Sequence, residues 1–207
     1  GVITLDADGR IRTMNKAASS IFDAQRYLSD HFAGTPYDPL SKGPLAHRYR
    51  PISLAKTQES HILQMGRQTG ANIHWLAMGV AAESTYVPFF NGITDVPAPY
   101  KRGKLPAQLN SAYWIFKHAS VLVDSHLHDF LPLLEEVQKE RNAAAIKLIK
   151  ETDRALASYQ GSERANFLTQ QSENFATDTM NAYKKLTLEL ITKMTDYSPL
   201  NFNTDEN

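Results

Sequence analysis

The residue types best suited to chemistry in this sequence are two arginines and an acid beside a hydroxyl. Arg48 and Arg50 immediately precede a strand-like run, and a guanidinium at a strand end can hold a carboxylate through two parallel hydrogen bonds. Such arginines are more often solvated or paired with a nearby acid, here Asp38. Glu83 and Ser84 fall between two strand-like runs, in the kind of connection that often carries functional groups.

The histidines offer a weaker case for catalysis or metal binding. His126, His128 and Asp129 cluster in the segment HLHD, but helical residues two apart point in different directions, and no His or Glu follows four residues on. We expect a polar joint between two helices, with Asp129 stabilising the positive end of the second. His61 and His74 lie in strand-like runs, where a packing role is usual. The sequence therefore predicts neither a metal ion nor a cofactor.

Motifs that identify a nucleophile or a nucleotide site are missing from the sequence. It has no G-x-S-x-G, Walker or H-E-x-x-H motif and no cysteine, so it holds no thiolate and no disulfide. Its 22 basic and 22 acidic residues balance, so no overall field attracts nucleic acid or a membrane surface. The apolar runs are much shorter than the roughly 20 residues of a membrane span. We expect a cytoplasmic protein that binds neither nucleic acid nor membrane.

The beginning of the chain predicts a hairpin followed by a helix. Residues 2–5 and 10–14 favour strands and flank an Asp/Gly turn. Asn15 is expected to cap the helix, which should end by Gly34 in a loop rich in Gly and Pro. Its apolar residues have the spacing of one buried face: Ala18, Ile21, Phe22, Tyr27, Leu28 and Phe32.

Strand patterns follow as far as residue 90. Residues 51–65 alternate like two half-buried antiparallel strands or one long bent strand, and residues 66–70 have the composition of a turn. Residues 72–80 and 84–90 predict two more strands. The first of these is the more apolar, so we expect it at the centre of the sheet.

Helix-forming residues dominate the rest of the chain. Three helices are expected over about 106–125, 129–159 and 162–196. Pro106 and Pro132 suit first helical turns, and Ser162 suits an N-cap after Gly161. The third helix carries an apolar stripe of Phe167, Phe175, Tyr183, Leu186 and Leu190. The residues alone thus predict an α/β protein with an antiparallel sheet and a long helical region, but they name no reaction.

Five stretches in series resemble the C-terminal part of the N-terminal-nucleophile (Ntn) cysteine dipeptidases, to which the secernins are related. They are SDHFAGTPYDPL (29–40), RYRPISLAKTQESHILQM (48–65), IHWLAMG (73–79), STYVPFFNGITDVPAPY (84–100) and LNSAYWIF (109–116). They occur in the family's order and at comparable distances. The resemblance continues through the helices to about Ser198.

The resemblance implies an α/β (α+β) fold, in which this chain supplies part of the antiparallel sheet of an αββα sandwich. In that family a cysteine at the start of the mature chain attacks the peptide carbonyl, and its own amino group acts as the base. Here Gly1 has no nucleophilic side chain and no cysteine follows. The family's full-length chain is about twice as long, so we expect this polypeptide alone to be inactive, with no catalytic residue of its own. Its implied partners are a dipeptide substrate, the remainder of the full-length chain and, through the helices, further copies of itself.

The resemblance also implies where substrate binds. An arginine of this region helps to hold the site in related hydrolases, so Arg50, or in second place Arg48, is expected to contact the substrate carboxylate. Glu83, Ser84 and the loop 91–100 are expected to border the dipeptide site. Trp75 and residues 87–90 are expected to form strand and core.

The sequence suggests four regions and two rival interpretations. Residues 1–28 form a hairpin and helix outside the family pattern, 29–104 the strand-rich part of the Ntn-like domain, 105–198 its helical region and 199–207 a flexible tail. Because residues 1–22 are similar to the opening of a PAS sensor domain, the first rival is a noncatalytic sensor or interaction module with helical dimerisation, which needs a five-stranded sheet after Ile21. The second is an oligomer scaffold, in which Phe167, Phe175 and Tyr183 would be exposed in a monomer.

Overall fold

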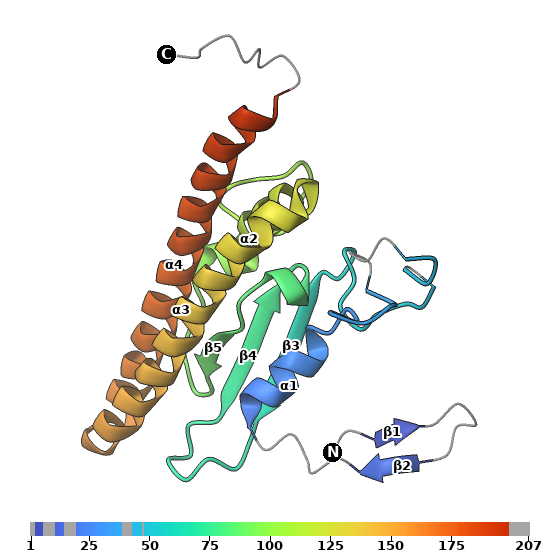
Figure 1. The fold of residues 1–207 in the computed structure, drawn as a ribbon. Helices are drawn as coiled ribbons and strands as arrows, with labels where there is room; N and C mark the ends of the chain where they lie inside the picture. Colours follow the sequence, from blue (N-terminus) through green and yellow to red (C-terminus); the bar gives the residue numbers. More distant parts are fainter. Residues whose placement is uncertain (1–2, 6–10, 15–19, 39–42, 47, 199–207) are drawn as a thin grey trace. The chain divides into compact units, whose positions relative to one another are not determined.

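The computed structural model describes residues 3–5, 11–14, 20–38, 43–46 and 48–198. The chain divides into two compact units, Gly1–Ala55 and Lys56–Asn207, whose elements are drawn in Figure 1. The class is mixed α/β, with a three-stranded antiparallel sheet and long helices. The four region boundaries expected from the sequence stay predictions, and the tail 199–207 lies outside the described residues.

The first unit contains the expected hairpin and a short helix. Strands β1 (Ile3–Leu5) and β2 (Ile11–Met14) pair antiparallel, whereas the predicted turn between them and Asn15 lie outside the described residues. Helix α1 (Ile21–Leu28) has Ser20 as its N-cap. The Ser20 hydroxyl accepts from the Asp23 amide at 3.3 Å, and the Asp23 carboxylate accepts from the Ser20 amide at 3.0 Å. This capping box satisfies two amides of the first turn.

Helix α1 ends earlier than the apolar spacing suggests. The prediction that Phe32 continues the helix is wrong, because its backbone lies in the left-handed region at φ 65°. The Asp30 carboxylate accepts from the Phe32 amide at 3.2 Å, which favours a turn over another helical turn. The Gly34 amide in turn donates to Asp38 at 2.9 Å, so side chains satisfy two backbone amides of this loop.

The sheet of the second unit consists of β3 (Glu59–Gln64), β4 (Ile73–Met78) and β5 (Val87–Phe90). Both pairings are antiparallel, and β4 is central, as its apolar sequence predicted. The prediction that strand structure begins near residue 51 is wrong. Residues 51–58 form no strand, with a turn at residues 55–56, and the Ser53 amide donates to the Asp30 carbonyl at 2.9 Å.

Three helices follow, as predicted, but their N-termini differ from the sequence expectation. They are α2 (Ala112–Ser125), α3 (Leu127–Ala155) and α4 (Gly161–Met194). Pro106 does not begin α2, because Trp114 and Ser111 hold the preceding loop through its carbonyls at 2.9 and 2.7 Å. Pro132 lies in the second turn of α3 rather than the first. The N-cap of α4 is Gln160, not the residue after Gly161.

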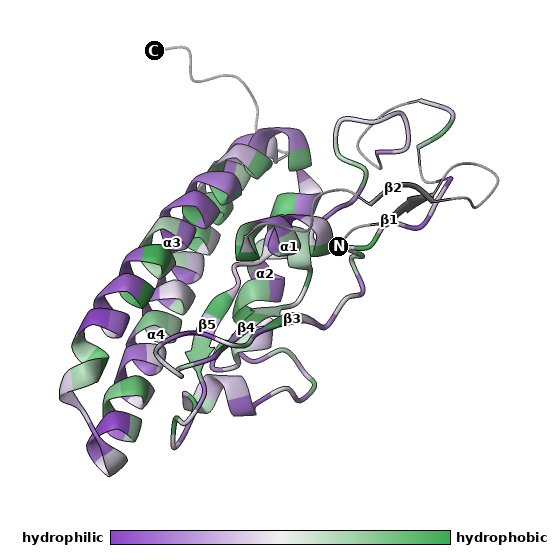
Figure 2. Ribbon diagram, turned by 90° about the horizontal axis from the view of Figure 1, so that it is seen from below, coloured by the Kyte–Doolittle hydropathy of each residue, from purple (hydrophilic) through white to green (hydrophobic). Residues whose placement is uncertain are grey.

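The helices pack on one another and on the sheet through their apolar sides. Figure 2 shows hydrophobic and hydrophilic residues alternating along α3 and α4. The stripe of α4 is buried at Phe175, Tyr183, Leu186 and Leu190, while Phe167 is half-buried and stacks on Tyr159 at 4.3 Å between ring centroids. Because the chain itself covers most of this stripe, the scaffold interpretation, which needs it exposed in a monomer, is wrong on this point.

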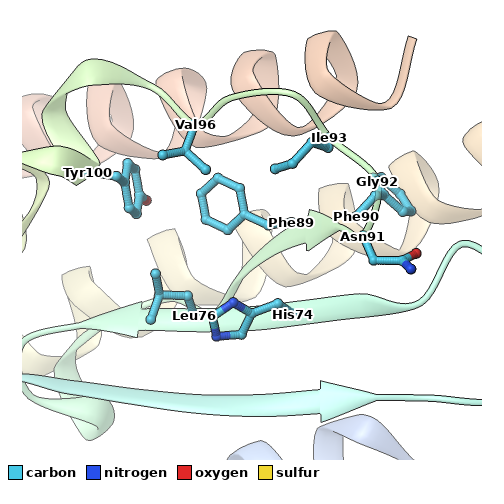
Figure 3. A pocket seen from close by; sticks show the side chains of 9 residues that line it. All are labelled: His74, Leu76, Phe89, Phe90, Asn91, Gly92, Ile93, Val96 and Tyr100. Atoms are coloured by element: carbon cyan, nitrogen blue, oxygen red, sulfur yellow. The ribbon is translucent and has the colours of Figure 1, made fainter. Parts of the chain in front are cut away.

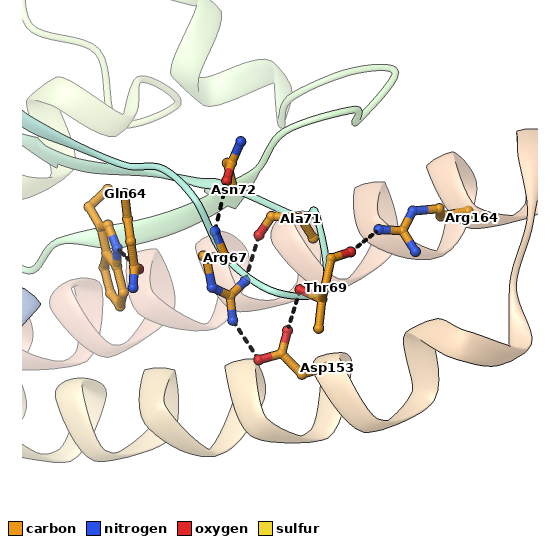
Figure 4. Close-up of polar contacts among 8 residues, drawn as sticks. Gln64, Arg67, Thr69, Ala71, Asn72, Asp153 and Arg164 are labelled. Carbon is orange, nitrogen blue, oxygen red and sulfur yellow. Dashed lines mark hydrogen bonds and ion pairs between the residues drawn. The ribbon is translucent and has the colours of Figure 1, made fainter.

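The turn between β3 and β4 is tied to α3 and α4 by polar contacts (Figure 4). The Arg67 guanidinium lies 2.5 Å from an Asp153 carboxylate oxygen, and the Thr69 hydroxyl donates to the other oxygen at 3.2 Å. Arg164 of α4 donates to the Thr69 carbonyl at 2.8 Å. Positive φ angles near 70° at Gly66 and Gly70 confirm the predicted turn.

The PAS-like alternative finds no support in the described part of the chain. Ile21 begins α1, and the sheet that follows has three strands rather than five. Of the helices in the described ranges, none has the length and hydropathy needed to cross a bilayer.

Candidate functional site

A cavity of about 350 Å³ lies beside β4 and β5, under the loop that follows β5 (Figure 3). Strand β4 supplies His74 and Leu76, and β5 supplies Phe89. The register places these three on one face of the sheet, because Phe89 pairs with His74 and side chains alternate along each strand. Their neighbour Trp75 points the other way into the core, where it is 1% exposed.

The loop over the cavity is held in place at several points. Gly92 turns the chain after β5 with φ 83°, a conformation that suits glycine. The Thr94 amide donates to the Thr169 hydroxyl of α4 at 2.9 Å, and Asp95 forms an ion pair with Lys101. Loop 91–100 is therefore a fixed wall that carries Ile93, Val96 and Tyr100 into the cavity lining.

Two polar atoms at this cavity are buried without a hydrogen-bond partner among the described residues. They are Nε2 of His74 and the hydroxyl oxygen of Tyr100. Burial lowers the pKa of His74, and the nearby His61 adds to this effect while Glu59 opposes it. Burial also raises the pKa of Tyr100 above its ordinary value. Both groups are therefore neutral near pH 7 and suited to hydrogen bonding in an apolar setting.

His61 belongs to the same sheet face as His74. Their rings meet edge to face with 5.3 Å between centroids. The His61 Nδ1 atom lies 3.1 Å from a Glu59 carboxylate oxygen, at the exposed edge strand. Among the described residues no group of three or more potential ligands is arranged for a metal ion.

Glu83 and Ser84 occupy the connection between β4 and β5, where a short 3₁₀ turn runs from Ala81 to Glu83. Ser120 of α2 donates to the Glu83 carboxyl group. Burial first, and then a hydrogen bond that the protonated Glu83 donates to Asp124, raise the pKa of Glu83 to about 8. The Ser84 hydroxyl donates to the Met78 carbonyl at 2.8 Å. Both side chains are buried and hold the turn against β4 and α2, and neither is among the described residues that line the cavity.

The two arginines lie in the first unit, and both are exposed. The Arg48 guanidinium carbon is 5.9 Å from the ring centroid of its neighbour Tyr49. Their role as substrate contacts stays a prediction. Trp75 and the β5 residues are strand and core as expected, and the Trp75 indole donates to Gln64 at 3.0 Å.

The segment HLHD forms the expected polar joint between α2 and α3. His126 occupies the junction and stacks on Tyr197 with 4.4 Å between ring centroids. The Tyr197 hydroxyl donates to Asp129 at 3.0 Å, and Asp129 lies in the first turn of α3.

Sequence reasoning assigned His74 a packing role and included Tyr100 only as part of a bordering loop. The available signal was the alternation of β4, which places His74 opposite to its buried neighbours Ile73 and Trp75. No pattern in the sequence showed that the Tyr100 hydroxyl would be buried beside the same cavity.

Comparison with known proteins gives consistent matches. Residues 11–140 match peptidase family C69, which is well over half of the chain. A probable dipeptidase of Latilactobacillus sakei is 33% identical over 202 residues, covering 95% of this chain and 42% of that protein. A probable dipeptidase B of Lactococcus lactis subsp. lactis is 29% identical, covering 81% of this chain and 36% of that protein. Dipeptidase A of Lactobacillus helveticus is 26% identical, with 86% and 38% covered. The chain thus spans less than half the length of these relatives.

Proposed function

This chain belongs to peptidase family C69, and we propose that it is the C-terminal part of a dipeptidase that hydrolyses dipeptide bonds. The observation that carries the proposal is the 33% identity to a probable dipeptidase over 95% of this chain. Because only 42% of that relative is covered, we assign to this chain a share of the site rather than the complete catalytic machinery.

The nucleophile of the proposed reaction is a cysteine supplied by the remainder of the full-length protein, because these 207 residues include no cysteine. Its free α-amino group takes the thiol proton and the thiolate adds to the peptide carbonyl. The carbon–nitrogen bond then breaks as that proton passes to the leaving amine, and water hydrolyses the thioester to release the cysteine. It follows that this chain alone does not hydrolyse dipeptides.

We propose that the sheet of the second unit forms one layer of an Ntn αββα sandwich. One face packs on the helices through Ile73 and Trp75, both 1% exposed. The opposite face carries Leu63, which is 61% exposed and pairs with His74 in the register. A sheet face with exposed apolar side chains favours burial against another layer. We assign that layer to the remainder of the full-length protein.

The proposed substrate contacts in the first unit are the two arginines. Arg50, with Arg48 second, holds the substrate carboxylate, since an exposed guanidinium can bind it through two hydrogen bonds. Glu83 and Ser84 border the site through the turn that they stabilise. The protein is proposed to work in the cytoplasm and to form oligomers through its helices, where Leu188 of α4 is 66% exposed.

The test compares this chain with the longest natural protein that contains it. Each is incubated with Leu-Leu and Leu-Phe, and released amino acids are measured by chromatography, with casein as a control substrate. We expect no release by this chain and release by a natural protein that begins with cysteine, and iodoacetamide should abolish that release. Dipeptide hydrolysis by the 207-residue chain would contradict the assignment, as would an inactive natural protein without cysteine.

A further inference from the structure

We propose that the cavity between β4, β5 and loop 91–100 is a subsite for a bulky apolar side chain of the substrate, aromatic or branched. His74 and Tyr100 would hydrogen-bond the backbone polar groups that accompany that side chain. This inference rests on the proposed function and adds the substrate class, namely dipeptides with at least one large apolar residue.

The size and walls of the cavity favour such a side chain. Its volume of about 350 Å³ lies at the lower end of the range of about 300–1,000 Å³ for ligand pockets. Leu76, Phe89, Ile93 and Val96 make most of its surface apolar, and no Asp, Glu, Lys or Arg is among the described residues that line it. A charged side chain would lose its hydration there without gaining a partner, so the cavity selects against acidic and basic residues.

The two polar atoms without partners indicate that the ligand also carries hydrogen-bonding groups. Folded proteins leave few buried polar atoms unpaired, so His74 Nε2 and the Tyr100 hydroxyl need an explanation. A neutral imidazole nitrogen and a phenol can each donate or accept, depending on tautomer and rotation. A peptide group offers both a carbonyl oxygen and an amide proton, and therefore satisfies either arrangement. An apolar ligand without such groups would leave both atoms unpaired.

The cavity wall is organised before any ligand binds. Thr94 anchors the loop to Thr169 of α4, and the ion pair of Asp95 with Lys101 closes the loop on itself. The Tyr100 ring packs edge to face on Phe89 with 5.1 Å between centroids. A wall fixed in this way loses little conformational entropy on binding. This is the property expected of a specificity pocket.

The binding test uses this chain labelled with ¹⁵N-histidine and two neutral probes, N-acetyl-phenylalanine amide and N-acetylglycine amide. We expect the phenylalanine probe to shift the His74 imidazole resonances saturably and the glycine probe to leave them unchanged. His126, which lies at the α2–α3 junction, serves as the internal reference. Equal responses to the two probes, or no response to either, would overturn the subsite.

A matched pair of variants tests whether the phenylalanine probe binds in the cavity. Val96→Phe fills the cavity from the loop and should weaken binding of the phenylalanine probe at least 10-fold. Val121→Phe places the same change on α2, where Val121 is 52% exposed, and should leave binding unchanged. If Val96→Phe does not fold, Ile93→Trp narrows the same space from another position of the loop. Unchanged affinity in a folded cavity variant refutes the inference.

Hydrolysis by the natural full-length protein separates this inference from the proposed function. Leu-Phe should be cleaved with a kcat/KM at least 10-fold above that of Gly-Gly. Equal kcat/KM values for the two dipeptides would contradict the proposed subsite and leave the dipeptidase assignment intact. Selective binding of the phenylalanine probe without hydrolysis of either dipeptide would contradict the dipeptidase assignment. The cavity would then still be a binding site for an apolar side chain.

Discussion

The pH dependence of stability gives a sharp test of how Glu83 is held. The residue is 8% exposed, and its carboxyl group accepts from Ser120 and is hydrogen-bonded with Asp124. Burial and that second acid raise its pKa from 4.5 to about 8. The folded state therefore keeps a proton on Glu83 at a pH where the unfolded chain has released it. Glu83→Gln imitates the protonated form, because its amide can accept from the serine and donate to the aspartate.

The sign and size of the effect follow from proton linkage. The stability associated with protonated Glu83 is fully present below the unfolded pKa of 4.5 and is lost as the pH rises toward about 8. Between about pH 5.5 and about pH 7.5 the loss is roughly 2–3 kcal/mol, since each of these two pH units corresponds to roughly 1.4 kcal/mol. The glutamine variant has no ionisable group at this position. Its free energy of unfolding should therefore change less between the two pH values and should equal or exceed that of the wild type at the higher pH.

The assay is urea unfolding followed by circular dichroism at both pH values. Glu135→Gln, which removes an exposed carboxylate from α3, is the control and should keep the wild-type pH dependence. If the wild type and Glu83→Gln lose the same stability between the two pH values, Glu83 is ionised in the folded protein. The description of a buried, protonated carboxyl group would then be wrong.

Three further substitutions and one control test the packing and polar contacts of the second unit, each by urea unfolding. Leu134→Ala removes a fully buried side chain and should cost about 2–5 kcal/mol, whereas Leu188→Ala, 66% exposed, should stay within about 0.5 kcal/mol of the wild type. Asp153→Asn breaks the pair with Arg67, whose side chain is 11% exposed, and should cost roughly 1–3 kcal/mol. Tyr183→Phe removes a buried hydroxyl that bonds Thr85 at 3.0 Å and should cost roughly 1–2 kcal/mol. Wild-type midpoints for Leu134→Ala, Asp153→Asn and Tyr183→Phe would contradict the packing described.

Local sequence signals predicted the elements better than their ends. The alternation of β4 and the apolar residues of β5 were sufficient to identify two strands and to place the first at the centre. The ends depend on contacts that are distant in sequence or on single side chains. Phe32 leaves the helix because an aspartate two residues earlier bonds its amide. The start of α2 is set by Trp114 and Ser111, which bond carbonyls about ten residues away.

The candidate site was predictable only in part, for a related reason. The loop 91–100 could be singled out as a border from its resemblance to a family, whereas the cavity needs the loop folded over His74 and Phe89. The buried state of Glu83 depends on Ser120, which is 37 residues away on α2. No pattern within the turn itself shows that its acid would be covered by a helix.

The register of β4 links the core to the cavity. Ile73, Trp75 and Ala77 must face the helices, and the Trp75 hydrogen bond with Gln64 fixes the pairing with β3. A slip of one residue would bury His74 and expose the indole, so the register holds firmly. The position of His74 therefore follows from the core, but its identity does not, because an apolar residue would fill the same place without an unpaired nitrogen. The proposed ligand, which would pair with both groups, would account for the choice of histidine there and for the buried Tyr100 hydroxyl.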